Sequence, residues 1–133
     1  MRIRNTTTIS DRAIRDVVAF VRPPGIGGFT VRVQNHGRGN YGLASGDSNR
    51  ILLRPPAKGS RNDTDHRRAG GYLPFPPIAG RLEWLVFIAA HELRHLWQAR
   101  VPKGRRVWGS RGQFSERDAD AYAIRMLRAW RRR

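Results

Sequence analysis

The fold is decided by residues 80–100, which read GRLEWLVFIAAHELRHLWQAR. Apolar side chains in this stretch point to almost every side of the helix that it predicts, so we expect the helix to lie buried at the centre of the fold. The pattern HExxH stands inside this helix as His91, Glu92 and His95. The core is therefore expected to carry two imidazoles and a carboxylate.

The spacing of these three residues is typical of a metal site. Residues four apart on a helix differ in direction by only about 40°. The imidazoles of His91 and His95 can therefore hold one metal ion from the same side. Glu92 sits about 100° around the helix from His91, beside the ion rather than bound to it. That position suits a general base acting on metal-bound water.

A last helix is predicted to open at Ser115, with Asp118 as a rough capping-box partner. At 100° per residue, Glu116 and Asp120 fall within its core-facing stripe, and Asp118 falls on the opposite side. The apolar members of the stripe are Ala119, Tyr122, Ala123, Met126, Leu127 and Trp130. Buried carboxylates need partners, and a metal ion with a metal-bound histidine would serve. The alternative is that both are first-turn carboxylates favoured by the helix dipole and left in water.

The segment HELRH, followed 21 residues after its second histidine by Glu116 in SERDADAYA, resembles the gluzincin pattern of HExxH and Glu-x-x-Ala-Asp. It is similar to the catalytic core of the Ste-type CAAX prenyl peptidases, to the soluble minimal gluzincins and to the ImmA/IrrE-type metallopeptidases. The resemblance covers about residues 81–130. It implies a zinc-dependent endopeptidase acting on a peptide or protein substrate.

Carried over by position, the resemblance makes His91, His95 and Glu116 the ligands of one Zn²⁺ per chain. Glu92 becomes the catalytic base and acid, which activates a zinc-bound water and protonates the leaving amine. Asp120 becomes an outer acceptor that orients a zinc-bound imidazole, that of His91.

The resemblance also implies that a strand beside the HExxH helix pairs with the substrate. Residues 30–34 and 41–45 are the two candidates for this strand. A donor for the reaction's oxyanion is also expected. Candidates for it are Tyr41, Tyr72, His36, His66 and several arginines; His36 is also read as a turn residue and His66 as a solvated one.

The remaining segments complete an α+β fold. Residues 10–22 predict an amphipathic helix capped at Ser10 or Asp11. Strands are predicted near residues 29–34, 41–45 and 50–54. We expect a single zincin-like metallopeptidase domain over 1–133, with a small, mostly antiparallel sheet packed on the central HExxH helix and flanking helices. Residues 55–80 form a long loop rich in Pro, Gly and charge. This loop, with Asp63, Asp65 and His66, or the C-terminal tail is a candidate cover that would keep the enzyme latent.

Composition excludes several classes of protein. The chain has no cysteine, so a disulfide scaffold, a thiol nucleophile and a Cys-ligated zinc are ruled out. The longest apolar run, Trp84 to Ala90, is far short of a membrane span. The segment MRIRNTTTISDRA lacks the apolar region of a secretory signal. These features predict a soluble, cytoplasmic protein.

The charge suggests an alternative function. There are 26 Lys and Arg against 10 Asp and Glu, a net charge of +16. The excess is spread evenly, at +8 in each half of the sequence, whereas a nucleic-acid-binding arm concentrates it. The second hypothesis is therefore a basic, nucleic-acid-associated protein that uses a zincin-like fold as scaffold or tethered protease. It predicts non-specific nucleic-acid binding through an Arg-rich surface.

Overall fold

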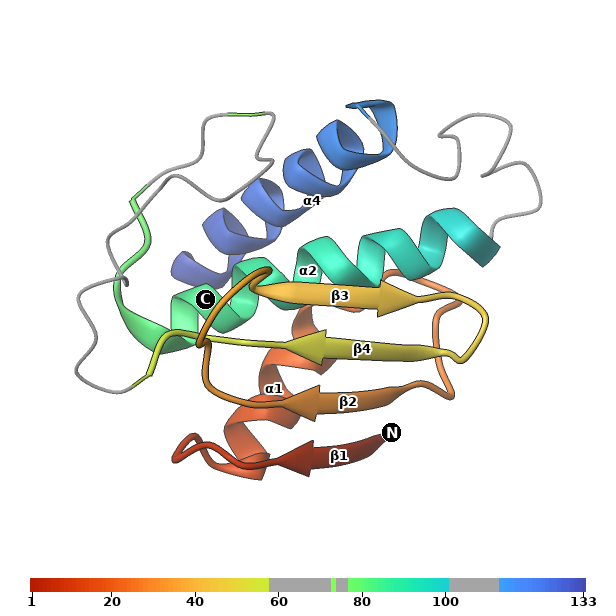
Figure 1. Cartoon of the computed structure of the whole chain (residues 1–133). Helices are drawn as coiled ribbons and strands as arrows, with labels where there is room; N and C mark the ends of the chain where they lie inside the picture. Colours follow the sequence, from red (N-terminus) through yellow and green to blue (C-terminus); the bar gives the residue numbers. More distant parts are fainter. Residues whose placement is uncertain (58–72, 74–76, 101–112) are drawn as a thin grey trace.

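The structure, a computed structural model, describes residues 1–57, 73, 77–100 and 113–133, with Gln113 described in its backbone alone. Within them the chain is mixed α/β, with an open four-stranded sheet and three helices (Figure 1). In chain order the elements are β1 (Arg2–Asn5), α1 (Asp11–Val21), β2 (Thr30–Val33), β3 (Gly42–Ser45), β4 (Arg50–Leu53), α2 (Gly80–Arg100) and α4 (Gln113–Arg131).

The sheet is not mostly antiparallel, and that prediction is wrong. Its strand order is β1-β2-β4-β3, and only β3 and β4 pair antiparallel. β1 and β2 run parallel because α1 carries the chain back between them, and β4 joins β2 in parallel on its other side. The prediction failed because β1 was not recognised and because β4 lies between β2 and β3, parallel to β2. β1, with the sequence RIRN, holds a single apolar residue and lies at an edge of the sheet.

The first helix confirms its predicted pattern. The Ser10 side chain caps α1 by accepting a hydrogen bond from the backbone N–H of Ala13 at 3.1 Å. α1 ends where Arg22 turns extended before Pro23, as expected for a residue that precedes proline. The buried residues of α1 are those of the predicted apolar stripe, Ile14, Val17, Val18 and Val21.

The central helix also confirms its prediction, with α2 running from Gly80 to Arg100 and buried from Trp84 through Leu93. It packs against α1, β3 and β4, and α4 packs along it as well. α4 begins at Gln113, two residues before the predicted start at Ser115. The two helices run antiparallel, since the start of α2 contacts the end of α4.

β3 is the strand beside the HExxH segment. A Cβ on Gly42 would stand 2.6 Å from Ile88 Cγ2 and 2.8 Å from Glu92 Oε2, so this close approach requires glycine. Further along, Gly46 lies close to Ala99. Of the two strands proposed to pair with a substrate, β2 has both edges occupied by β1 and β4. That half of the prediction is wrong, and β3 is the edge strand.

Some predictions fall on residues outside the described ones. Most of the 55–80 loop, with Asp63, Asp65, His66 and Tyr72, belongs to this group, so its role as a cover stays a prediction. Within the described ranges, no helix has the length and apolarity needed to cross a bilayer.

Candidate metal centre

His91, Glu92 and His95 form a compact group on one turn of α2. Each offers one ligand atom, and these atoms lie within 4.8 Å of one another. His91 and Glu92 are 3% and 5% exposed, and the His95 side chain is 20% exposed. The group could hold a metal ion. It owes its shape to the i, i+4 spacing on a helix whose other sides are packed in the core.

Glu116 joins this group from α4. Its Oε2 lies 3.0 Å from His91 Nε2, and its Oε1 lies 3.2 Å from His95 Nε2. The two Nε2 atoms are 3.1 Å apart. In tetrahedral zinc sites with bonds of about 2.0–2.2 Å, neighbouring ligand atoms stand roughly 3.3–3.6 Å apart. The atoms of the three side chains therefore lie a few tenths of an ångström closer together than the ligands of a shared ion. We call His91, Glu92, His95 and Glu116 the metal cluster.

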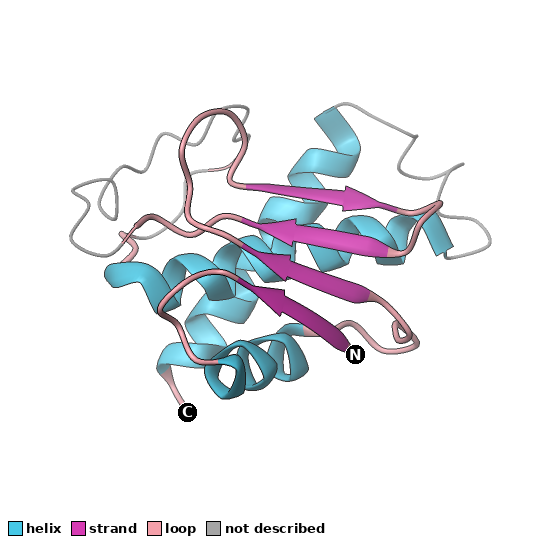
Figure 2. Cartoon of the chain, turned by 60° about the horizontal axis from the view of Figure 1, so that its bottom comes forward, coloured by secondary structure: helices cyan, strands magenta, loops and turns pink. Residues whose placement is uncertain are grey.

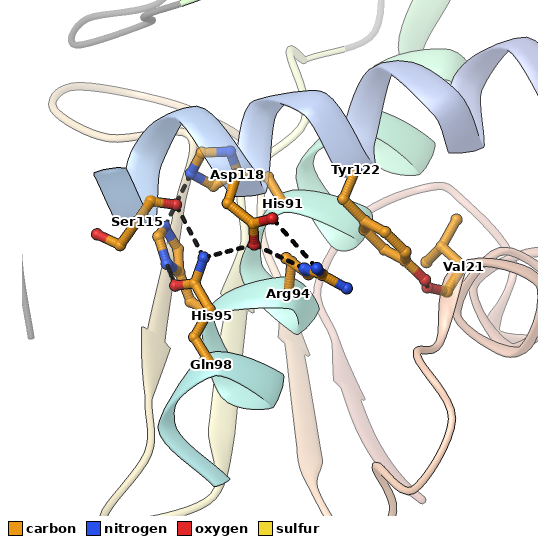
Figure 3. A network of polar contacts seen from close by, with 8 residues as sticks. All are labelled: Val21, His91, Arg94, His95, Gln98, Ser115, Asp118 and Tyr122. Atoms are coloured by element: carbon orange, nitrogen blue, oxygen red, sulfur yellow. Dashed lines mark hydrogen bonds and ion pairs between the residues drawn. The ribbon is translucent and has the colours of Figure 1, made fainter. Parts of the chain in front are cut away.

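The other nitrogen of each imidazole faces an oxygen. Asp120, fully buried, places Oδ1 2.9 Å from His91 Nδ1. Gln98 Oε1 lies 2.8 Å from His95 Nδ1 (Figure 3). From the sequence, Asp120 was predicted as an acceptor beside an imidazole, but Gln98 was not. The position of Gln98 in the sequence does indicate this role. It stands three residues after His95 and hence on the same side of the helix.

The orientation of the Gln98 amide is set by its surroundings. Its Nε2 donates to the Ser115 carbonyl and to Asp118 Oδ2, both at 2.9 Å. Both of these groups are acceptors, so Oε1 is the atom that faces His95. His95 Nδ1 must then donate, and a neutral His95 carries its lone pair on Nε2, toward Glu116.

Arg94, inside the HExxH motif, is occupied by an ion pair. Its Nε and Nη2 donate to the two Asp118 oxygens at 2.7 and 3.1 Å. Its guanidinium also lies over the Trp97 ring, 3.7 Å from the centroid. Asp118 thus faces α2, not the opposite side as predicted. The predicted direction of Asp118 was wrong because Arg94 and Gln98 on α2 donate hydrogen bonds to its carboxylate, which therefore lies between α2 and α4.

The surroundings of Glu116 favour the ionised form of its own carboxyl group. Burial raises the pKa of Glu116, but hydrogen bonds and charge from the imidazoles of His91 and His95, when these are protonated, outweigh it and hold that pKa well below its ordinary range. Glu116 is therefore ionised at neutral pH. Its side chain remains 34% exposed, which leaves this side of the cluster open to solvent.

Two of the candidate oxyanion donors lie in a stack of rings. His36 stacks on Tyr41 with centroids 3.9 Å apart, and Tyr41 stacks on Trp84 at 4.9 Å. His36 Nε2 also lies 2.9 Å from the Gly39 carbonyl, within the HGRGN turn. The structure thus places His36 in the loop between β2 and β3, just before the bend at Arg38 and Gly39. Tyr41 directly precedes Gly42, the residue that abuts Glu92.

In comparisons with protein-family models, curated proteins and solved structures, nothing matches this chain. The chemistry of the site therefore rests on its own geometry.

Proposed function

We propose that this chain is a zinc-dependent metallopeptidase with endopeptidase activity and a zincin-like arrangement of its site. His91, His95 and Glu116 hold the metal, and Glu92 acts as general base and acid. One observation carries the proposal. The ligand atoms of three side chains from two helices stand 3.0–3.2 Å apart, and an oxygen lies 2.8–2.9 Å from the other nitrogen of each imidazole.

When both imidazoles are neutral, the arrangement favours a cation because its inward-facing atoms are all acceptors. The Gln98 oxygen, hydrogen-bonded to His95 Nδ1, and the Asp120 oxygen, 2.9 Å from His91 Nδ1, favour hydrogen on each Nδ1, which leaves two Nε2 lone pairs directed at the Glu116 carboxylate. Three acceptors at this separation repel one another, and a divalent cation between them removes the repulsion. Two imidazoles and a carboxylate are the ligand set of several catalytic zinc sites.

Glu116, not Glu92, is the third ligand in this proposal, since its oxygens lie within 3.2 Å of both Nε2 atoms. Zinc bound there supplies Lewis acidity to a water molecule and to the scissile carbonyl. Glu92, 5% exposed, takes the proton of the attacking water and delivers it to the leaving amine.

β3 is the proposed site of the peptide. It is an edge strand, and Gly42 brings its backbone against Glu92. An extended peptide pairing with the outer edge of β3 would pass beside the metal cluster. Main-chain pairing of this kind binds peptides with little dependence on side chains.

The test combines metal content with cleavage. Purified protein should bind one zinc per chain by elemental analysis and cleave denatured casein or a quenched fluorescent peptide library. Glu92→Gln should keep the zinc and lose cleavage by at least about 100-fold. Glu83→Gln, the same change elsewhere on α2, is the matched control and should cleave normally. Equal cleavage by wild type and Glu92→Gln would show that the assigned mechanism is wrong.

A further inference from the structure

The sheet has one covered and one open face. α2 packs against β3 and β4, and the inward side chains share one apolar core with α1 and α2. These inward side chains include Val31, Val33, Ile51 and Leu53, all buried. No described helix covers the opposite face (Figure 2). Side chains alternate along a strand, and paired residues point to the same side, so the strand register identifies the outward residues.

Arginine dominates this outward face. One row across the sheet reads Arg2, Thr30, Arg50, Ser45, and the next reads Arg4, Arg32, Leu52, Leu43. All four arginines are exposed. Neighbouring strands stand about 4.8 Å apart and alternate residues along a strand roughly 7 Å apart. The Cα atoms of the four arginines therefore fall within a patch about 10 Å wide. We call Arg2, Arg4, Arg32 and Arg50 the sheet arginines.

The strands that carry this patch supply no counter-charge. None of the four strands contains an acidic residue, and the described part of the chain shows no ion pair to a sheet arginine. Of the ten acidic residues, Glu92, Glu116, Asp118 and Asp120 lie at the metal cluster or next to it, and Asp47 lies in the turn between β3 and β4. Charge that is even along the sequence is thus uneven between the strands and the metal cluster.

Keeping the arginines together costs stability. Arg4 and Arg32 occupy directly paired positions on β1 and β2, where like charges repel and lower the stability of the sheet. Destabilising arrangements of side chains, such as this pair of like charges, are expected at functional sites.

The chemistry of the face indicates what it binds. Arginine forks bind phosphate oxygens in a bidentate manner. The outward positions carry no aromatic side chain, so the face offers no platform for stacking bases. Leu43 and Leu52 are its only large apolar residues, too few for an apolar protein partner. These features fit a repeating phosphate backbone bound without sequence specificity.

We infer that the open face of the sheet binds the phosphate backbone of nucleic acid through Arg2, Arg4, Arg32 and Arg50. This site lies on the side of the sheet away from α2 and its metal cluster. It does not depend on the proposed peptidase activity, because none of its residues belongs to the metal cluster.

The test compares two variants of equal charge. One replaces the sheet arginines by glutamine, and the control replaces Arg12, Arg22, Arg128 and Arg132, which are exposed on or beside α1 and α4. Binding to a labelled 20-base-pair DNA duplex is followed by fluorescence anisotropy across a salt series. Wild type should show an affinity that falls steeply with salt. The sheet variant should bind on the order of 100-fold more weakly, with the log–log salt slope reduced by about 3 to 4.

The control variant should keep most of the affinity and slope. Equal losses in the two variants would reduce the inference to general attraction by the net charge of +16 and overturn it. Tight binding to phosphatidylserine vesicles with no binding to the duplex at 150 mM salt would overturn it in favour of a membrane surface. If the fourfold variant fails to fold, the double variant Arg2→Gln with Arg50→Gln takes its place and should reduce the log–log salt slope by about 2. Its control is the double variant Arg128→Gln with Arg132→Gln, which should keep most of the slope.

Discussion

Between α2 and α4, charged side chains lie against opposite charges or hydrogen-bonding partners, whereas the sheet arginines extend from an open surface. Arg94 pairs with Asp118, and Glu116 lies between His91 and His95. On the sheet, Arg4 is paired in register with Arg32, a residue of the same charge. One region brings opposite charges together, and the other keeps like charges close.

The difference separates two ways in which a protein can present an ionic site. In the metal cluster, two helices and several hydrogen bonds hold the side chains in one arrangement, which would favour one small cation in one geometry. On the sheet, the strand register sets only the spacing of the arginine backbones, and the side chains are long and flexible. That favours an extended polyanion, bound through many equivalent contacts.

Removing a ligand from the metal cluster should have the largest effect. Glu116→Ala deletes the one ligand contributed by α4, and we expect the zinc affinity to fall by at least about 100-fold, since even outer partners are worth 10- to 100-fold. Competition with a fluorescent zinc chelator measures the change. Glu83→Ala is the control and should bind zinc as wild type does. An unchanged zinc affinity in Glu116→Ala would show that Glu116 is not a ligand of the metal.

Changing an outer acceptor should have a smaller effect. Asp120→Asn preserves the shape of a fully buried side chain but replaces the carboxylate beside His91 Nδ1. We expect zinc affinity to fall about 10- to 100-fold. Gln98→Met, which removes the acceptor of His95 Nδ1, should act in the same direction.

A readout of tautomer distinguishes orientation from packing. In wild type, ¹⁵N NMR of the metal-free protein at a pH where the imidazoles are neutral should show His95 protonated on Nδ1. Gln98→Met should shift this population toward Nε2. Loss of thermal stability with an unchanged tautomer would assign Gln98 to packing between α2 and α4 alone.

The ion pair at the other end of the two helices should contribute less. Arg131 donates to Glu83, with Nη2 2.5 Å from Oε1, and the hydrogen bond from Arg131 holds the pKa of Glu83 below its ordinary value of 4.5. We expect Glu83→Gln to lower the free energy of unfolding by about 0.5 kcal/mol at pH 7. Urea unfolding of both proteins measures the difference.

The pH dependence of that difference has a defined sign. A carboxylate with a lowered pKa in the folded state stabilises the fold above its unfolded pKa and loses this contribution as the pH falls through the folded value. The gap between wild type and Glu83→Gln should therefore close below about pH 4. A gap that widens on acidification would contradict the assignment.

The smallest effect should be a gain in stability on the sheet. Arg4→Thr removes the like-charge pair with Arg32, and we expect the free energy of unfolding to rise by about 0.3 kcal/mol at low salt. Arg2→Thr is the matched control, because Arg2 is paired with Thr30. The gain should shrink at high salt, where surface charges are screened. An equal gain from Arg2→Thr would indicate a general charge effect.

Much of the helical structure could be predicted because its signals are local. The apolar spacing of α1 identified its buried face, and the HExxH spacing placed two imidazoles on one side of α2. The stripe on α4 correctly placed Glu116 and Asp120 toward α2, since rotation along a helix follows from its periodicity.

The parts that failed depend on contacts between segments distant in the sequence. β1 has one apolar residue and becomes a strand by pairing with β2, which also makes the sheet largely parallel. Asp118 turns toward α2 because Arg94 and Gln98 bind it there. Neither partner can be inferred from the residues around Asp118.

By itself, the sequence determined which side chains share a face of each helix, because helical geometry converts residue number directly into direction. Only the tertiary structure decided that Glu116 meets both histidines and that four arginines share one face of the sheet. The first depends on how α4 packs along α2. The second depends on the strand order β1-β2-β4-β3 and its register. Both depend on packing between segments that are distant in the sequence, and the periodicity of a single helix or strand does not specify that packing.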